Sequence, residues 1–475
     1  MKARDRIGAS SSTPPPDATE PYSETIVAAA TPPGRGAIKL IRVSGPASRN
    51  LVGRRLPPSL HRPWRPRHSS LTDFLDRDGK RIDQVLVTFF AAPASYTGED
   101  VVEISCHGSP AVEVQIVNGL LEAGARLAEP GEFTLRAFLN GKMDLVQAEA
   151  VRDLIRSQTV HQARVARDQL DGKLSRLLRS AKERLVRIIS HMETGLEFVE
   201  DPVEPDSRDD LLRDLGRIVG RIRRLEESFR VGRVLRDGFT ATIVGRPNAG
   251  KSSIFNALCR SDRAIVSTLP GTTRDAIDQT VDLEGIPMQL VDTAGIRTAR
   301  SPVERLGVKK SLDYVGASDL TLFVVDRSRG FSAEDARIWT ELKDTPYLLV
   351  VNKVDLEAVL RIPSELESGA RCRSDVSALT GEGLDALRRA IRKAVAPESD
   401  WERERVVITE LRHKECLQRA RQRLCEGMKG YRDGLSEEFP LYHLRGALSE
   451  LDAVTGETTV EDLLGQIFST FCIGK

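Results

Sequence analysis

Three patterns in the sequence predict a multidomain α/β protein, with an N-terminal α+β domain, a central all-α helical domain and an α/β P-loop domain inserted into the helical one. Strand-like segments separated by turn residues fill the chain from about residue 22 to residue 140. Apolar residues spaced three and four positions apart then predict long amphipathic helices on both sides of residues 236–398. Inside that block, Gly245–Ser252 reads GRPNAGKS and matches the phosphate-loop pattern G-x-x-x-x-G-K-[ST].

The N-terminal domain is expected to cover residues 22–140, after a disordered tail at residues 1–21 that contains a run of serines and prolines. Segments rich in β-branched and aromatic residues predict its strands, and Pro110–Ala125 is expected to form a helix on the sheet. The predicted strands are Thr25–Ala30, Ala37–Val43, Val85–Phe90 and Val101–Cys106.

The helical domain is expected in two parts, residues 141–235 and residues 399–475, with helical periodicity resuming at Trp401. Because neither part forms a full bundle easily, we expect the two to pack together. Thr458 and Glu461 have the spacing of a capping box at the start of the last helix. The apolar stripes run over Leu170–Leu196, Leu211–Leu225, Leu441–Leu451 and Val460–Phe471.

Composition favours a protein of a reducing compartment. The net charge is +1, so no global field directs the chain to nucleic acid or to an anionic membrane. The six cysteines contain no C-x-x-C pair, which argues against a zinc site or a disulfide framework. No apolar run approaches the roughly 18 residues that span a bilayer. We therefore expect a cytosolic protein without a membrane segment.

One local cluster of arginines lies among prolines around Trp64. Such a cluster either contacts an RNA backbone or forms a solvated loop. Its members are Arg54, Arg55, Arg62, Arg65 and Arg67.

Four further motifs follow the phosphate loop in the order of a guanine-nucleotide pocket. Ser267–Asp275 reads STLPGTTRD, Asp292–Gly295 reads DTAG, Asn352–Asp355 reads NKVD and Ser377–Leu379 reads SAL. A strand-like segment precedes the loop and a helix-forming segment follows it, so bound phosphates are expected at a helix N-terminus. Five motifs in this order and spacing indicate a Ras-like α/β P-loop GTPase domain.

Individual residues of these motifs have expected roles. Ser252 is placed to bind Mg²⁺ through its hydroxyl, and Asp292 follows an apolar strand as a Walker-B aspartate does. Asp355 can accept hydrogen bonds from the N1–H and 2-amino groups of guanine, which adenine does not offer. The residues expected to contact the nucleotide are Asn248, Ala249, Gly250, Lys251, Ser252, Ser253, Ser267, Thr268, Leu269, Pro270, Gly271, Thr272, Thr273, Asp292, Thr293, Ala294, Gly295, Asn352, Lys353, Asp355, Ser377, Ala378 and Leu379.

The position after DTAG is Ile296, whose apolar side chain cannot orient the attacking water as the glutamine of many small GTPases does. Another group must therefore orient that water. Asn248 resembles the asparagine with which potassium-activated GTPases hold K⁺ beside the phosphates, where a fixed cation does the electrostatic work of an arginine finger. The alternative for Asn248 is a residue that only stabilises the loop.

Long segments outside the nucleotide motifs resemble the tRNA-modification GTPase family called MnmE or TrmE. The resemblance covers nearly all of the chain after residue 22. A nucleotide pocket alone would not explain these segments. The most specific of them are Ala30–Gly36, Ser95–Ile104, Ala128–Ala150 and Phe471–Lys475.

The resemblance implies a three-part protein: an N-terminal domain that dimerises and binds a tetrahydrofolate one-carbon donor, a helical domain, and an inserted potassium-dependent GTPase. With a flavin-dependent partner, MnmG or GidA, the family attaches aminomethyl-type groups such as carboxymethylaminomethyl to C5 of the wobble uridine of certain tRNAs. GTP hydrolysis is the conformational switch that this modification requires. A homodimer that assembles with this partner and with tRNA is therefore implied.

The resemblance also assigns ligands. Glu304 matches the water-orienting glutamate of the family and fills the role that Ile296 leaves open; alternatively it is an exposed helix carboxylate. Ser252 and Thr273 match the Mg²⁺ ligands. The matching K⁺ ligands are Asn248, Ser267, Leu269 (through its carbonyl) and Thr272, and the matching folate-contacting residues are Arg42, Glu103, Lys142 and Lys475.

Two other functions are compatible with parts of the sequence. A GTPase switch in ribosome or RNP assembly would use the same nucleotide motifs, but it would leave Ala128–Ala150 and the C-terminal tail unexplained. A folate-dependent methyltransferase with Cys472 as its nucleophile would need a base near the thiol, and the sequence identifies none.

Overall fold

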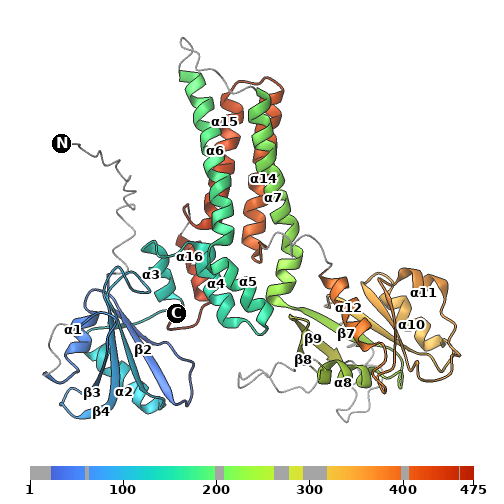
Figure 1. Ribbon diagram of the computed structural model, residues 1–475, viewed down its shortest axis with the longest axis horizontal. Coiled ribbons are helices and arrows are strands. Elements are labelled where there is room, and N and C mark those ends of the chain that lie inside the picture. Colours follow the sequence, from blue (N-terminus) through green and yellow to red (C-terminus); the bar gives the residue numbers. More distant parts are fainter. Residues whose placement is uncertain are drawn as a thin grey trace, which may run out of the picture. The chain divides into compact units, whose positions relative to one another are not determined.

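The computed structural model of the 475-residue chain describes residues 23–58, 64–197, 208–261, 278–292, 318–396, 406–458 and 461–475. The chain forms two compact units, one made of Met1–Ala148 with Thr459–Lys475 and the other of Glu149–Thr458. An α+β part, a helical part and a P-loop part are all present, as the sequence predicts (Figure 1). None of the described helices is both long and apolar enough to cross a membrane.

The first unit is built on a six-stranded sheet in the order β3-β4-β5-β2-β1-β6. Neighbouring strands are antiparallel except β1 and β6, which are parallel. Helix α2 (Pro110–Glu122) packs on the sheet, where its Ile116 and Leu120 join Val43 and Ile104 in the core. The strands are β1 (Ile26–Ala29), β2 (Ile38–Ser44), β3 (Ser69–Leu75), β4 (Arg81–Phe90), β5 (Val101–His107) and β6 (Arg126–Leu127).

The last helix of the chain belongs to this first unit. Helix α16 (Glu461–Ser469) packs against α3 (Glu132–Leu139), and the buried Phe468 and Phe471 share a core with Leu135. The sequence pattern predicts that the C-terminal residues belong to the helical domain, because their apolar residues recur with the same helical period as those of the preceding helices. The division into domains stays a prediction, but this stripe is buried in the N-terminal unit.

The second unit contains the helical bundle. Helices α6 and α7 come from the first half of the chain and α14 and α15 from the second; α14 packs against α15 and α7, and α15 against α6 (Figure 1). The two parts therefore pack together as expected. The bundle helices are α4 (Leu145–Arg156), α5 (Val160–Leu170), α6 (Lys173–Glu197), α7 (Arg208–Asp237), α14 (Leu411–Arg432) and α15 (Glu438–Thr455).

The segment that leads into α14 is not helical. Residues 406–410 are not helical, and their backbone bonds to the bundle instead: Ile408 N–H donates to Ser228 Oγ at 3.2 Å, and Gln169 Nε2 donates to the Val407 carbonyl at 3.1 Å. Helix α14 then begins at Leu411. The predicted start at Trp401 and the capping box at Thr458 and Glu461 depend on residues that lie outside the described ranges.

The inserted domain has a six-stranded sheet in the order β12-β11-β10-β7-β9-β8. All neighbouring strands are parallel except β8 and β9, which form an antiparallel hairpin. Helix α8 (Lys251–Ser261) follows β7 directly after the phosphate loop. The other elements are β7 (Phe239–Val244), β8 (Asp278–Leu283), β9 (Ile286–Asp292), β10 (Leu320–Asp326), β11 (Tyr347–Asn352), β12 (Arg373–Val376), α10 (Ala333–Leu342), α11 (Ser364–Gly369) and α12 (Leu384–Val395).

A buried ion cluster joins α4 to α14. The Glu149 carboxylate accepts hydrogen bonds from Arg412 Nε at 3.1 Å and Nη2 at 3.0 Å, and lies 2.8 Å from His413 Nε2. Arg412 also donates to the carbonyls of Ala453 and Val454 near the end of α15, which have no partner further along that helix. Burial alone would raise the pKa of Glu149, but His413 and Arg412 lower it to about 2.

Replacing Glu149 by glutamine should therefore destabilise the bundle in a pH-dependent way. Loss of one partner of a buried ion cluster costs about 3–5 kcal/mol. Because the folded-state pKa lies below the ordinary glutamate value of 4.5, the carboxylate stabilises the fold above that value and loses this effect as the pH falls toward about 2. Urea unfolding followed by circular dichroism should show a large difference between wild type and Glu149→Gln near neutral pH and a smaller one at about pH 3.

Glu227→Gln is the matched control, since Glu227 forms an ion pair with Arg223 in which both side chains are about two-thirds exposed. Its effect should stay below about 1 kcal/mol. Equal effects of the two substitutions would show that the buried cluster does not stabilise the bundle.

Candidate functional site

Two glycines shape the phosphate loop between β7 and α8. Gly250 has a φ of 96°, and a Cβ there would lie 2.0 Å from Asn352 Nδ2; a Cβ at Gly245 would lie 2.3 Å from the Val324 carbonyl. No side chain fits at either position without moving backbone or a buried amide. The loop can therefore approach β10 and β11 closely and present its N–H groups at the start of α8, where an anion is favoured.

Lys251 is the first residue of α8 and is buried. Its Nζ donates to the carbonyls of Gly245 and Arg246, both at 2.8 Å. The ammonium group is thus folded back over the loop, where it can exchange these carbonyls for phosphate oxygens. Ser252 and Ser253 follow it in the first turn and are exposed, and the role of Ser252 as a Mg²⁺ ligand stays a prediction.

The NKVD motif braces the phosphate loop. At the end of β11, Asn352 Nδ2 donates to the Ala249 carbonyl at 2.9 Å, and Asn352 Oδ1 accepts from the Ala378 N–H at 3.1 Å. Lys353 Nζ donates to the Asn248 carbonyl at 2.9 Å and to Asp326 Oδ2 at 2.6 Å. Two adjacent residues therefore connect the phosphate loop with the segment after β12 and with the end of β10.

Asp355 and Ser377–Leu379 lie at the same edge of the sheet. They follow the neighbouring parallel strands β11 and β12, and the Val354 N–H bonds to the Val376 carbonyl at 3.2 Å. Asp355 is exposed, and buried Ser377 accepts a hydrogen bond from the Thr380 N–H at 3.1 Å. This is the geometry in which a carboxylate and a backbone N–H can face a guanine base.

Asn248 adopts the left-handed conformation, with a φ of 61°. Its carbonyl is held by Lys353, and its exposed side chain makes no hydrogen bond within the described residues. The amide is therefore available to a ligand beside the phosphates. The side chain of Asp292, at the end of β9, and the predicted residues Ser267–Thr273, Thr293–Gly295 and Glu304 lie outside the part of the chain that the structure describes; their roles stay predictions.

A second group of predicted residues meets in the first unit. Arg42 on β2 is the cross-strand neighbour of Glu103 on β5, and its Nε and Nη2 donate to Glu103 Oε1 at 3.0 and 2.8 Å. The guanidinium lies 5.0 Å from the ring centre of Tyr96 and 5.7 Å from that of Phe133. Its Nη1 is buried and has no hydrogen-bond partner, which is unusual for a charged group and leaves one donor for a ligand.

The C-terminal tail reaches the same place. Gly474 has a φ of 94°, and a Cβ there would lie 2.1 Å from the Ala29 carbonyl on β1. The Gly131 N–H, at the start of α3, contacts the Cys472 carbonyl at 3.4 Å. Burial, and next the charge of Arg42, lower the pKa of the Lys475 ammonium, while Glu103 opposes this shift. The charges of Arg42 and Glu103 therefore act on the Lys475 ammonium.

Lys142 is not part of this contact network. It is exposed, and its Nζ donates to the Pro93 carbonyl at 2.9 Å. Sequence reasoning missed the aromatic neighbours Tyr96 and Phe133, although both lie in segments that carry the family resemblance. It also missed buried Arg136, which binds Glu132 at 2.8 Å and Glu99 at 3.1 Å in the same region.

The arginines of the cluster around Trp64 do not share one environment. Arg55 is buried, and its Nε donates to the Gly119 carbonyl in α2 at 2.9 Å, so this residue has a structural role. Trp64 packs edge-on against Phe89. Arg62 lies outside the described residues. No group of three His, Cys, Asp or Glu side chains that could hold a metal occurs in the described part of the chain.

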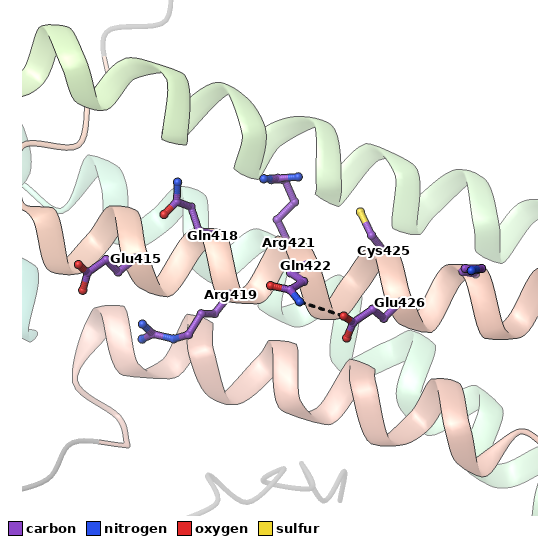
Figure 2. A pocket seen from close by; sticks show the side chains of 8 residues that line it. Glu415, Gln418, Arg419, Arg421, Gln422, Cys425 and Glu426 are labelled. Atoms are coloured by element: carbon purple, nitrogen blue, oxygen red, sulfur yellow. Dashed lines mark hydrogen bonds between the residues drawn. The ribbon is translucent and has the colours of Figure 1, made fainter.

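A groove of about 650 Å³ lies along α14 (Figure 2). Its charged groups are largely paired: Arg421 with Glu226 of α7 and Arg419 with Glu450 of α15, both at 2.8 Å. Gln422 and Glu426 also bond to each other, at 3.0 Å. The groove thus presents no free set of groups for chemistry. Its lining residues are Glu415, Gln418, Arg419, Arg421, Gln422, Cys425, Glu426 and Lys429.

Comparison with known proteins matches both units. The family model described as the MnmE helical domain matches residues 145–472, and that of the GTP-binding protein TrmE N-terminus matches residues 25–142. The protein named tRNA modification GTPase MnmE from Aquifex aeolicus (strain VF5) is 41% identical over 453 residues, covering 95% of this chain and 100% of the relative. The protein of the same name from Koribacter versatilis (strain Ellin345) is 42% identical over 460 residues, covering 95% of this chain and 99% of the relative.

Two solved structures are similar to part of the chain. The G domain of the T. maritima FeoB iron transporter is 22% identical, with 33% of this chain and 98% of that chain covered and a TM-score of 0.24. Aquifex aeolicus Era bound to GDP·AlF4⁻ is 24% identical, with 39% and 66% covered and a TM-score of 0.26.

Asn352→Ala should weaken nucleotide binding. The substitution leaves the Ala249 carbonyl and the Ala378 N–H without their partner, and each unsatisfied group costs about 1–3 kcal/mol. Titration with a fluorescent GDP analogue should show at least about a tenfold loss of affinity, equal to about 1.4 kcal/mol. Glu365→Gln, on the exposed side of α11, serves as the control. Unchanged affinity of the Asn352 variant would mean that the brace is dispensable.

Proposed function

Because the chain belongs to the MnmE family of tRNA modification GTPases, it is a GTP hydrolase that acts in tRNA modification, and we propose a specific reaction for it. In this proposal the chain is a potassium-activated GTPase that works in the cytoplasm with a flavin-dependent partner of the MnmG or GidA type. Together they add an aminomethyl or carboxymethylaminomethyl group to C5 of the wobble uridine of certain tRNAs, using a tetrahydrofolate one-carbon unit. The observations that carry this proposal are the Arg42–Glu103 ion pair and the close approach of the C-terminal tail to β1, next to β2, the strand that carries Arg42.

The residues at this meeting point fit a folate. A pterin presents donors like those of guanine, and Glu103 uses only Oε1 to bind Arg42, so Oε2 can accept them. The unpartnered Nη1 of Arg42 supplies a donor to the same ligand. Tyr96 and Phe133 provide aromatic walls beside the guanidinium, and the Lys475 ammonium can pair with the glutamate carboxylates of the ligand. Lys142, on the surface of the same unit, can pair with that glutamate tail from outside.

The residues of the phosphate loop fit a monovalent cation. Asn248 is fixed through its carbonyl and offers a free side-chain oxygen, and we assign Ser267, the Leu269 carbonyl and Thr272 as its companions. A potassium ion held by these residues would supply positive charge beside the phosphates. Ser252 and Thr273 would hold Mg²⁺, and Glu304 would orient the attacking water.

A homodimer is also part of the proposal. The exposed Leu71 and Leu86 are direct cross-strand neighbours on β3 and β4, with 64% and 45% of their surface accessible. A pair of leucines on an open sheet face is apolar surface that a second copy of the chain can cover.

Mass spectrometry of wobble uridines from cells lacking the gene tests the proposed function. Loss of the modified nucleoside, with restoration by the wild-type gene, is the expected result. Unchanged nucleosides would favour the alternative, a GTPase switch in ribosome or RNP assembly without modification chemistry.

We predict that GTP hydrolysis is much faster in KCl than in NaCl at equal ionic strength, because the Asn248 side chain helps to hold the cation. Asn248→Ala should lower kcat about tenfold or more and leave GDP affinity nearly unchanged, since the interaction develops in the transition state. Asn256→Ala, an exposed asparagine on α8, is the matched control. Equal rates in the two salts would contradict the potassium assignment.

Lys475→Ala should weaken binding of 5-formyltetrahydrofolate about tenfold, the effect of losing one charge-assisted hydrogen bond. GTP hydrolysis should be retained, because Lys475 and the phosphate loop lie in different units. Calorimetry measures the folate affinity, with the exposed Lys80→Ala as control and Cys472→Ser as the test of thiol chemistry. A truncated chain without Cys472–Lys475 that binds folate as tightly as the full chain would remove the tail from this site.

A further inference from the structure

Helix α6 presents a row of arginines on the side opposite its packing face. Its buried residues, such as Leu178, Leu185 and Met192, recur at helical spacing and face the bundle. Arg176 and Arg187 lie about half a turn from this face and Arg179 about 100° from it, and all three are exposed, whereas half-buried Arg184 lies on the opposite flank of the helix. The three exposed residues, Arg176, Arg179 and Arg187, form the row.

The row has no carboxylate partner within the described residues. Arg176 donates only to the Asp171 backbone carbonyl, at 2.7 Å. Nearby acidic side chains are already engaged: Asp168 binds Lys173 at 2.6 Å, and Glu193 binds Arg445 at 2.6 Å. The remaining acid on this face of α6 is Glu183, for which the structure shows no ion pair.

Several exposed arginines of α7, by contrast, are matched. On α7, Arg217 pairs with Asp214 at 2.7 Å, Arg213 pairs with Asp210, and Arg223 lies 3.6 Å from Glu227. The arginines of the α14 groove are paired as well. The net charge of +1 for the whole chain therefore hides a local excess of positive charge on α6. Like charges along one helix face repel each other, so this row is stabilised when an anion lies against it.

We propose that this arginine face of α6 binds the sugar–phosphate backbone of tRNA. The inference rests on the proposed function, which supplies tRNA as the polyanion. Guanidinium groups bind phosphate in a planar, bidentate manner. Residues 176 to 187 extend over about 17 Å of helix, a length that meets several phosphates of one strand. Contacts of this kind position the tRNA and carry no base specificity.

The experiment compares two double variants of the full-length protein. Arg179→Gln with Arg187→Gln removes two members of the unpaired row, and Arg213→Gln with Arg217→Gln removes two paired arginines from α7. Fluorescence anisotropy of labelled tRNA is measured between about 50 and 200 mM KCl. The α6 variant should bind at least about tenfold more weakly at low salt, and its slope of log K against log salt should be shallower by about 1–2. The α7 variant should bind within about twofold of wild type, and both should hydrolyse GTP normally.

Several results would overturn the proposal. One is wild-type affinity and salt slope in the α6 variant; another is an equal loss in both variants, which would indicate only an effect of net charge. A third is an α6 variant that loses binding to phosphatidylserine vesicles but not to tRNA, which would identify a lipid surface as the anion. If wobble uridines are unchanged in cells lacking the gene, the proposed function fails, but the comparison of the two variants still decides whether α6 binds RNA.

Discussion

The close approach of the C-terminal tail to the first strand constrains the whole chain. Gly474 lies so near the Ala29 carbonyl that no side chain fits, and Phe468 and Phe471 are buried beside α3. The chain must therefore return to its N-terminal unit after residue 458. Residues 149–458 therefore lie between two segments of the first unit. The helical bundle in this stretch is built from an outgoing and a returning part of the chain, and the P-loop domain is inserted between these two parts.

The insertion is attached to the helical part through both apolar and polar contacts, and Val231, Val234 and Leu235 of α7 share a core with the sheet of the inserted domain. Arg236, at the end of α7, binds Glu410, just before α14, at 2.6 Å, so the chain segments that enter and leave the inserted domain are held together. The turn of the β8–β9 hairpin bonds to the N-cap of α5, where Thr159 Oγ1 donates to the Gly285 carbonyl at 2.7 Å.

Local patterns predicted much of the fold, and long-range contacts account for what was missed. The four predicted strands and the long stripes of α6 and α7 were confirmed because each has a clear period along the sequence. Strand β3 carries few apolar residues and β6 has only two residues, so the sequence pattern predicted neither strand. In the site, the brace from Asn352 to Ala249 and the packing of Tyr96 and Phe133 around Arg42 join residues far apart in the chain. Contacts between residues so far apart in the sequence cannot be predicted from motif spacing or from periodicity.

The most direct test is a crystal structure of the protein with 5-formyltetrahydrofolate. The pterin should lie within hydrogen-bond distance of the Glu103 carboxylate, with Arg42 and Lys475 in contact with the same ligand molecule and Gly474 still against Ala29. A ligand bound away from these residues, or bound there with the C-terminal tail displaced, would contradict the assignment of the tail to the folate site.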